Sequence, residues 1–204
     1  MDCAAGEGRS PTGCKRQVQV EVKLKVKVKQ DSKLGSILKD QAMLTIDQLI
    51  ATLPQTGLVR WLGIRPARHE PMQVLTEILV TPEQGIIGDR YRSNRGKRQV
   101  TLVQFEHLGA IASMLGRESI SPQDLRRNIV VQGINLLALK GQRFTLGEAL
   151  LECTGLCQPC SRMEATFGSG GYNAVRGHGG ITATILTAGR IAEGDRLRLE
   201  CPHL

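Results

Sequence analysis

Aromatic side chains are scarce in this sequence, which has three Phe, two Tyr and one Trp among its 204 residues. Proteins that bind single-stranded nucleic acid use aromatic rings on which the bases stack. The chain nevertheless carries a formal charge of +8 at pH 7, which fits nucleic acid, an anionic membrane surface or an anionic small molecule as the partner. The positive charge therefore indicates a negatively charged partner, and the shortage of aromatic residues disfavours nucleic acid.

Long apolar stretches are also missing. The longest candidate, residues 108–115, falls far short of the ~20 apolar residues that a transmembrane helix needs. The N-terminal sequence MDCAAGEGRS contains no apolar signal-peptide core. We therefore expect no membrane span and a cytoplasmic location. In that compartment the six cysteines are expected to be reduced thiols, whose roles would be metal binding or reactivity.

The first part of the chain is typical of a basic tail. Residues 17–30 alternate apolar and polar side chains, which indicates a strand, and four lysines between residues 23 and 29 share its polar face. This pattern fits either an edge strand kept soluble by lysine or a row of lysines that contacts an anionic surface. We assign residues 1–33 to a partly disordered basic tail with a possible lysine-rich strand, and residues 44–201 to the folded domain.

The folded domain is predicted to be mainly β. Residues 44–53 favour a short helix that Thr45 can cap, and residues 105–115, 122–127 and 161–167 also favour helices. Short β-prone runs, mostly separated by Gly or Pro, predict a β-barrel or a barrel-like sandwich with a few short helices. These runs cover residues 59–64, 74–81, 99–103, 128–132, 148–153, 182–186 and 195–200.

Three cysteines, Cys153, Cys157 and Cys160, lie close together in ECTGLCQPCSRME. Their spacing matches the iron–sulfur loop of radical S-adenosylmethionine enzymes, but such loops come early in the chain. A zinc site would need a fourth ligand such as His178 or His203. The other two interpretations are a redox pair of Cys157 and Cys160, and a single reactive thiolate at Cys160.

The single-thiolate interpretation has the most support from the local sequence. Cys160 follows an apolar strand and directly precedes the expected helix 161–167. A helix N-terminus and the neighbouring Arg162 would both favour the thiolate form. Cys153 lies in the expected strand itself and is interpreted as a small buried hydrophobic residue.

Two basic segments could hold an anion. In GDRYRSNRGKRQV, Arg90 follows a glycine-bounded turn, and we expect Asp89 to orient its guanidinium by a charge-assisted hydrogen bond. In LRRNIVVQG, Arg126, Arg127 and Asn128 lead into an apolar strand, so some of them are expected to face a cleft. Arginine pairs well with phosphate and carboxylate groups, although runs of charge also occur as plain solvated surface.

Taken together and in this order, these segments resemble the MOSC family, named for the C-terminal domain of molybdenum-cofactor sulfurases. The resemblance extends from about residue 44 to residue 200, and the chain before about residue 34 has no counterpart. The matching stretches are GIIGDRY, RQVTLVQFEHL, LRRNIVVQGINLLALKGQRFTLGEALLECTGLCQPCSRME and GHGGITATILTAGRIAEGD.

The resemblance implies a MOSC-type β-barrel with a basic cleft around one cysteine. The functional cysteine of the family matches Cys160, which would carry sulfur as a persulfide or ligate molybdenum. One branch of the family reduces N-hydroxylated compounds with a bound molybdenum cofactor, and another works beside a pyridoxal-phosphate-dependent cysteine desulfurase. Many members have His where this chain has Tyr91, and Cys157 is not a general family feature.

The resemblance and the residues agree on an anionic ligand. Molybdopterin carries a phosphate and a dithiolene, which call for arginines, backbone amides and a soft thiolate. We expect Cys160 to be the catalytic residue and metal ligand. The expected cofactor-binding residues are Arg90, Arg126, Arg127 and Asn128 at the phosphate, Arg162 and His178 further out, and Gly179 and Gly180, whose backbone could approach the cofactor closely.

The predicted function is therefore that of a molybdenum-cofactor-binding protein that acts through a reactive cysteine. It would be either a reductase of N-hydroxylated compounds or a sulfur carrier for assembling metal–sulfur cofactors. No flavin, nicotinamide or two-iron–two-sulfur cluster signature is present, so a reductase acting on a small-molecule substrate would need an external electron donor. A sulfur carrier would need a separate desulfurase. The alternative is a basic nucleic-acid-binding protein without catalytic activity.

Overall fold

Short, largely apolar strands form the framework of the structure, a computed structural model that describes residues 44–91 and 96–200. These described residues belong to one compact unit. The basic tail of residues 1–33, its lysine-rich strand and His203 lie outside the described residues.

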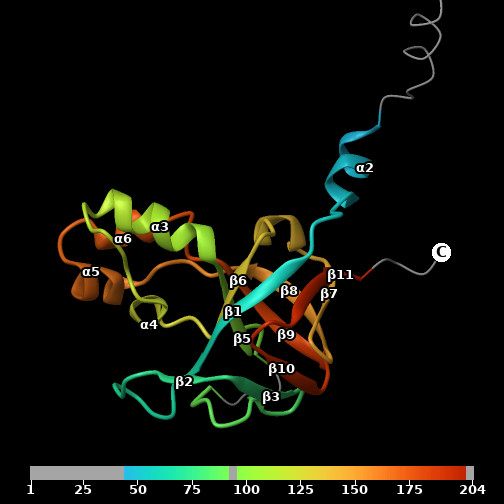
Figure 1. Ribbon diagram of the computed structural model, residues 1–204, viewed down its shortest axis with the longest axis horizontal. Coiled ribbons are helices and arrows are strands. Elements are labelled where there is room, and N and C mark those ends of the chain that lie inside the picture. The colour runs from blue at the N-terminus through green and yellow to red at the C-terminus, as the bar shows by residue number, and fades with distance from the viewer. Residues whose placement is uncertain (1–43, 92–95, 201–204) are drawn as a thin grey trace, which may run out of the picture. The chain divides into compact units, whose positions relative to one another are not determined.

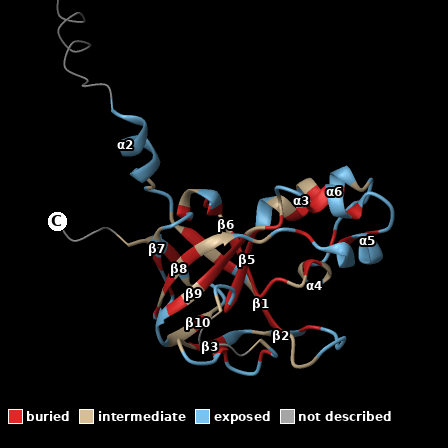
Figure 2. Ribbon diagram, turned by 180° about the vertical axis from the view of Figure 1, so that it is seen from behind, coloured by how far each residue is buried: buried red, intermediate tan, exposed pale blue. Residues whose placement is uncertain are grey.

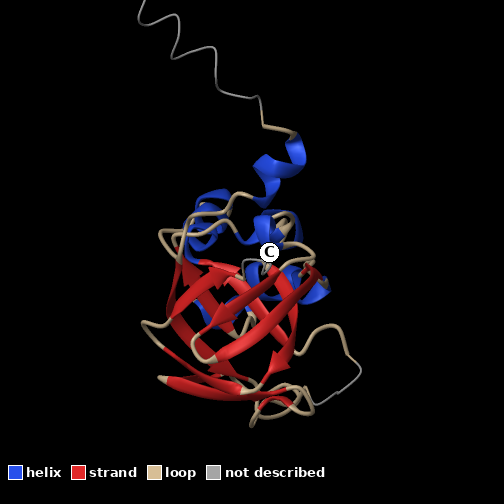
Figure 3. Ribbon diagram, turned by 90° about the vertical axis from the view of Figure 1, so that its right-hand side faces the viewer, coloured by secondary structure: helices blue, strands red, loops and turns tan. Residues whose placement is uncertain are grey.

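Seven strands close into a barrel, so the predicted β-barrel is confirmed. The order around the barrel is β11-β7-β8-β9-β5-β6-β1, and β1 pairs with β11 to close it (Figures 1 and 3). Only β5 and β6 run parallel; the other neighbours in the barrel are antiparallel. The strands are β1 (Gly57–Ile64), β5 (Val100–Gln104), β6 (Ile129–Gln132), β7 (Arg143–Leu146), β8 (Ala149–Leu156), β9 (Ile181–Thr187) and β11 (Arg196–Leu199).

A second, smaller sheet lies beside the barrel and consists of β3 (Glu77–Thr81), β4 (Gly85–Ile86) and β10 (Gly189–Ala192). The sequence predicted one strand over residues 74–81, and the structure divides it at Thr76. The first part, β2 (Gln73–Leu75), pairs with β1 of the barrel, and β3 pairs with β4 and β10. Strands β4, β7 and β10 were not predicted, because they are only two to four residues long; β10 and β7 also pair with strands distant in sequence, β3 and β11.

The alternation of side chains along β5 and β6 builds two cores at once. Leu102 and Ile129 point into the barrel and belong to its interior core. Val103 and Val130 point outward, into a second core formed with the helices on the outside of the barrel. Because both faces of these strands are covered, β5 is buried along its whole length (Figure 2).

The outer core consists of side chains from α3 (Phe105–Met114), α4 (Pro122–Leu125), α5 (Ser161–Phe167) and α6 (Gly171–Val175). These helices gather on one side of the barrel (Figure 1). Met163 and Phe167 of α5 are buried there, so the helix that follows the cysteine loop is anchored on the barrel.

The predicted helices are confirmed, but three of them are shorter than expected: those over residues 44–53, 105–115 and 122–127. The helix expected over residues 122–127 ends at Leu125, because Arg126 adopts a left-handed backbone with φ 53°. A 3-10 helix, η1 (Leu136–Leu139), was not predicted. Helix α2 (Ile46–Ala51) begins at Thr45, which closes a capping box with Gln48. None of the helices within the described ranges is long and apolar enough to cross a membrane.

Candidate functional site

Two cavities on the helical side of the molecule share four lining residues: His69, Arg126, Cys160 and Arg162. We call the first, of about 460 Å3, the arginine cavity; it is lined by Arg65, Arg68, His69, Arg90, Leu125, Arg126, Arg127, Cys160, Arg162 and Met163. We call the second, of about 640 Å3, the polar cavity; it is lined by His69, Gln123, Asp124, Arg126, Cys160, Ser161, Arg162, Ala165 and Thr166.

Cys160 lies where the two cavities meet, as the residue that directly precedes α5. Its side chain is exposed and makes no capping hydrogen bond to the helix, so the sulfur is free to react. Cys157 is only partly exposed and Cys153 is buried, as the sequence predicted for Cys153. Burial raises the pKa of the Cys153 thiol. Among the described cysteines, only Cys160 faces either of these cavities.

The loop that carries Cys160 is held by Arg127. This side chain is only 8% exposed, and burial lowers its pKa. Its Nε donates to the Gly179 carbonyl (2.8 Å) and its Nη1 to the Leu125 carbonyl (2.8 Å). Its Nη2 donates to the Cys157 carbonyl at 3.3 Å. Arg127 therefore lines the arginine cavity, but its guanidinium donates hydrogen bonds to three backbone carbonyls, one of which belongs to the cysteine loop.

Gly179 and Gly180 let two backbone segments approach each other closely. A Cβ on Gly179 would lie 2.2 Å from the Cys157 carbonyl oxygen, and a Cβ on Gly180 would lie 1.9 Å from that of Leu102. The Cys157 amide also donates to the Gly180 carbonyl at 2.8 Å. The close approach made by these glycines is thus between the 177–180 turn, the cysteine loop and β5, and neither glycine lines the two cavities.

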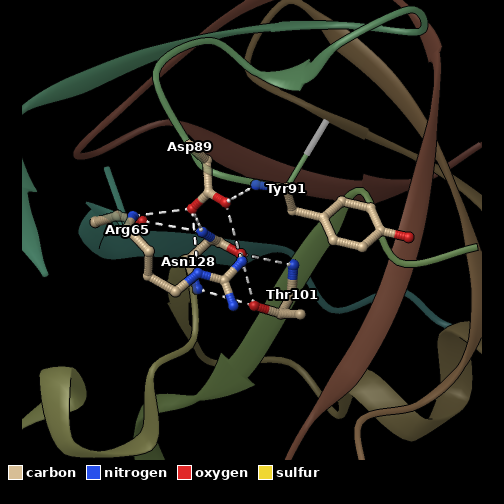
Figure 4. A network of polar contacts seen from close by, with 6 residues as sticks. Arg65, Asp89, Tyr91, Thr101 and Asn128 are labelled. Atoms are coloured by element: carbon tan, nitrogen blue, oxygen red, sulfur yellow. Dashed lines mark hydrogen bonds and ion pairs between the residues drawn. The ribbon is translucent and has the colours of Figure 1, made fainter. Parts of the chain in front are cut away.

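A buried polar network fixes the floor of the site (Figure 4). Asp89 is 1% exposed, and its oxygens accept from the Arg65 amide (2.9 Å), Nε (3.2 Å) and Nη2 (3.2 Å). They also accept from the Tyr91 amide at 2.8 Å. Burial raises the pKa of Asp89, but the charge and hydrogen bonds of Arg65, with the Tyr91 amide, outweigh burial and leave it below its ordinary value.

The expected pairing of Asp89 with Arg90 is not formed. Asp89 pairs with Arg65 from the end of β1 instead, because the turn at residues 85–90 packs its backbone against that strand. Arg90 is linked to Arg65 only through its own amide, which donates to the Arg65 carbonyl at 2.7 Å. Its guanidinium lines the arginine cavity. Tyr91 enters the network through its main chain, and its ring points away from it (Figure 4).

Asn128 belongs to the same network and has no contact with the cavities. It is 0% exposed, and its Nδ2 donates to the Gly63 carbonyl (3.2 Å) and to Asp89 (3.0 Å). Its Oδ1 accepts from Thr101 Oγ1 at 2.7 Å and from Arg65 Nη2 at 3.5 Å. Because both ends of the amide are occupied, Asn128 positions Arg65 and Asp89.

The arginine cavity carries an excess of positive charge, because the carboxylate beneath it, Asp89, already pairs with Arg65. Burial lowers the pKa of Arg126, and the charges of Arg162, Arg65 and Arg90 lower it further. Guanidinium groups do not lose their proton in proteins, so the repulsion between these positively charged side chains persists at neutral pH. An anion with several acceptor oxygens would relieve it.

His69 and Arg126, which line both cavities, are the two non-glycine residues of the described chain with positive φ, at 70° and 53°. Such conformations cost about 1–3 kcal/mol and cluster at functional sites. Arg126 Nη1 also donates to the Glu70 carbonyl at 3.2 Å, which ties the two segments together. Arg65, Arg68 and His69 were not predicted from the sequence, although they lie together in the basic run RPARHE that follows β1.

His178 lies away from the two cavities. Its ring packs edge-on against His107 at 4.8 Å between ring centroids, and the Nδ1 atoms of both rings are buried without a partner. Burial lowers the pKa of His107, and the charge of His178 lowers it further. Across residues 44–91 and 96–200, no three His, Cys, Asp or Glu side chains converge as metal ligands, so a zinc site with His178 finds no support.

Comparison with known proteins agrees with this architecture. The family model of the MOSC domain matches residues 75–198, which is more than half of the chain. No curated protein sequence matches the chain.

Solved structures with the same fold include the YuaD protein of Bacillus subtilis, with a TM-score of 0.63 and 21% identity over 72% of this chain and 97% of that one. YiiM of Geobacillus stearothermophilus has a TM-score of 0.59 and 18% identity over 71% of this chain and 75% of its own. YiiM of Escherichia coli has a TM-score of 0.56 and 18% identity over 72% and 71%. At these identities the likeness concerns the fold.

Proposed function

Because the chain belongs to the MOSC domain family, we propose that its arginine cavity binds the molybdenum cofactor and that Cys160 acts on it, as a ligand of the metal or as a carrier of its sulfur. One observation carries the proposal. The exposed Cys160 thiol lines the same cavity as six arginines: Arg65, Arg68, Arg90, Arg126, Arg127 and Arg162.

The residues present fit a molybdopterin. Its phosphate supplies acceptor oxygens and negative charge, which suit side chains that can only donate hydrogen bonds. Since the described residues hold no cluster of three metal-ligating side chains, a metal at Cys160 must bring other ligands with it, as the dithiolene of the cofactor does. A thiolate is a soft ligand of the kind that suits such a metal.

The cavity residues divide into two groups by what their hydrogen-bond donors already do. The guanidinium groups of Arg68, Arg90 and Arg162 make no hydrogen bond within the described chain, and that of Arg126 makes one, so these groups are available to the phosphate. Arg65 and Arg127 are held by Asp89 and by backbone carbonyls, so they shape the cavity and add charge. Three residues predicted to bind the cofactor do not line this cavity and instead contact the residues that shape it: Asn128 contacts Arg65, the Gly179 carbonyl accepts from Arg127, and the Gly180 carbonyl accepts from the cysteine loop.

When bound, a molybdenum centre supplies two-electron redox chemistry, and the protein's part is then to hold, orient and shelter it. Cys160 Sγ must release its proton to bind the metal or to accept a sulfur atom, and the same cavity holds the arginines that would bind the phosphate. As a reductase of N-hydroxylated compounds, the protein takes electrons from an external donor. As a sulfur carrier, it receives sulfur from a pyridoxal-phosphate-dependent cysteine desulfurase.

The experiment is to purify the full chain from cells that make molybdenum cofactor and to measure two quantities. Molybdenum is assayed by mass spectrometry, and persulfide by thiol-specific labelling. Stoichiometric molybdenum that disappears in Cys160→Ser supports a cofactor-dependent reductase, and persulfide at Cys160 without molybdenum supports a sulfur carrier. Cys157→Ser is the matched control and should retain the signal. If Cys160→Ser keeps both signals, the proposed function is wrong.

The phosphate site has its own test. A charge-assisted hydrogen bond contributes about 1.5–3 kcal/mol, so Arg90→Gln should lower the affinity for the cofactor about tenfold or more. Arg198→Gln removes the same charge from β11, where Arg198 lines a separate cavity of about 310 Å3 with Thr145 and Arg190. This control should bind as the parent does. Equal losses in both variants would reduce the effect to net charge and exclude a built site.

A further inference from the structure

The side chains that line only one of the two cavities differ in what they offer a ligand. Those found only in the arginine cavity are four arginines and two apolar residues, Leu125 and Met163. Arginine donates hydrogen bonds and accepts none. The polar groups found only in the polar cavity are Gln123, Asp124, Ser161 and Thr166. These are an amide, a carboxylate and two hydroxyls, all of which can accept.

We propose that the polar cavity is the subsite for the second reactant, an uncharged small molecule that carries N–H or O–H donors, and that Asp124 determines this preference. The inference rests on the proposed function, since it places an anionic cofactor in the arginine cavity. The two ligands then meet at Cys160, which lines both cavities.

The carboxylate of Asp124 is held in place by its own helix. Its Oδ2 accepts from the Ser121 amide at 3.1 Å, in the capping box that starts α4. Its Oδ1 accepts no hydrogen bond from any described residue and is therefore available to a donor on the ligand. Thr166 contributes a hydroxyl from α5, so both helices present acceptors to the cavity.

Charge supports the same division. The residues confined to the arginine cavity add four positive charges, from Arg65, Arg68, Arg90 and Arg127. Among those confined to the polar cavity, Asp124 is the charged residue, and it is negative. A phosphate gains more in the arginine cavity, whereas a neutral molecule with donor groups gains a charged acceptor in the polar cavity.

The test measures how ligands protect Cys160 of the purified full chain from iodoacetamide, with the modified cysteine located by fragment-ion mass spectrometry. The two probes are acetohydroxamic acid, an uncharged molecule with N–H and O–H donors, and inorganic phosphate. Acetohydroxamic acid is expected to slow modification of Cys160 and to do so equally well in the presence of phosphate, because the two occupy different cavities.

Asp124→Asn should weaken the protection by acetohydroxamic acid about tenfold, the value of one hydrogen bond to a charged acceptor, and leave that by phosphate unchanged. Thr166→Val, which keeps the side-chain shape, should weaken it several-fold. Ser121→Ala is the matched control, because it removes the other half of the capping box without touching either cavity. A loss in Ser121→Ala equal to that in Asp124→Asn would assign the effect to the helix start and overturn the proposal.

The proposal is also overturned if acetohydroxamic acid does not protect Cys160, if the two probes exclude each other, or if both cavity variants behave as the parent. Failure of this inference is distinguishable from failure of the proposed function. Asp124→Asn must retain the molybdenum or persulfide found in the parent, and its loss would place Asp124 in the cofactor site. The proposed function instead fails when Cys160→Ser retains both signals.

Discussion

Asp89→Asn tests the network beneath the arginine cavity most directly. The carboxylate accepts five hydrogen bonds, three of them from Arg65, and it is 1% exposed. An amide of the same shape must turn its NH2 group toward one set of these donors. The least harmful orientation faces Arg65 Nη2 and the Tyr91 amide, so two hydrogen bonds are lost and two donors lose their acceptor.

The magnitude follows from burial. Removing one partner of a buried ion pair costs about 3–5 kcal/mol. Arg65 keeps 18% of its side-chain surface exposed and retains its contact with Asn128, so we expect the lower end, about 3 kcal/mol. For a protein of this size that corresponds to a fall in Tm of about 6–12 °C.

The assay is urea-induced unfolding monitored by circular dichroism, with Glu77→Gln as the control. Glu77 pairs with Arg190 at 3.3 Å, but the two side chains are 64% and 42% exposed. Breaking an exposed pair of this kind should cost less than about 1 kcal/mol. A loss below about 1 kcal/mol in Asp89→Asn as well would refute the argument that burial sets the energy of the network.

The pH dependence gives an independent check. The pKa of Asp89 in the folded protein lies below its ordinary value of 3.8, so its carboxylate stabilises the fold at every pH above that value. This contribution is lost as the pH falls from about 3.8 through the lower pKa of the folded state. The difference in stability between the parent and Asp89→Asn should therefore be constant near neutrality and shrink in acid.

Three further variants test other parts of the molecule. Gly180→Ala should lower the free energy of unfolding by more than about 2 kcal/mol in urea, because φ is +83° and the new Cβ would lie 1.9 Å from the Leu102 carbonyl oxygen. The pKa of His107 lies below 6.5, its ordinary value, so protonation of this side chain opposes folding. As the pH falls below 6.5, His107→Gln should therefore lose less stability than the parent, and equal acid-unfolding midpoints for the two proteins would contradict this. Tyr91→Phe should leave the molybdenum or persulfide content unchanged, since Tyr91 binds Asp89 through its amide.

Much of the fold could be predicted from local sequence. The barrel strands carry apolar residues at every second position, and Thr45 with Gln48 marks the start of α2. Local sequence could not show which strands pair with one another. The run over residues 74–81 looks like one strand, but its two halves join different sheets, because β1 pairs with the first half and β10, from a distant part of the chain, pairs with the second.

The candidate site divides in the same way. Cys160 was identified from its place between an apolar strand and a helix, and the structure puts it at the mouth of two cavities. His178 was expected in the outer part of the cofactor site because it lies among the glycines of residues 177–180, yet its ring packs against His107 of α3. A residue's neighbours in sequence do not reveal which element its side chain will face.

By itself, the sequence indicated the barrel class, singled out Cys160 as the candidate reactive residue and showed a surplus of basic side chains. Only the tertiary structure decided which arginines converge. Asp89 and Arg90 are adjacent in sequence, but closure of the barrel brings Arg65 to the carboxylate and leaves Arg90 at the cavity. The physical reason is that a buried carboxylate takes whichever donors the packed backbone delivers to it, and in a barrel built largely from pairings between strands distant in sequence those donors come from other strands.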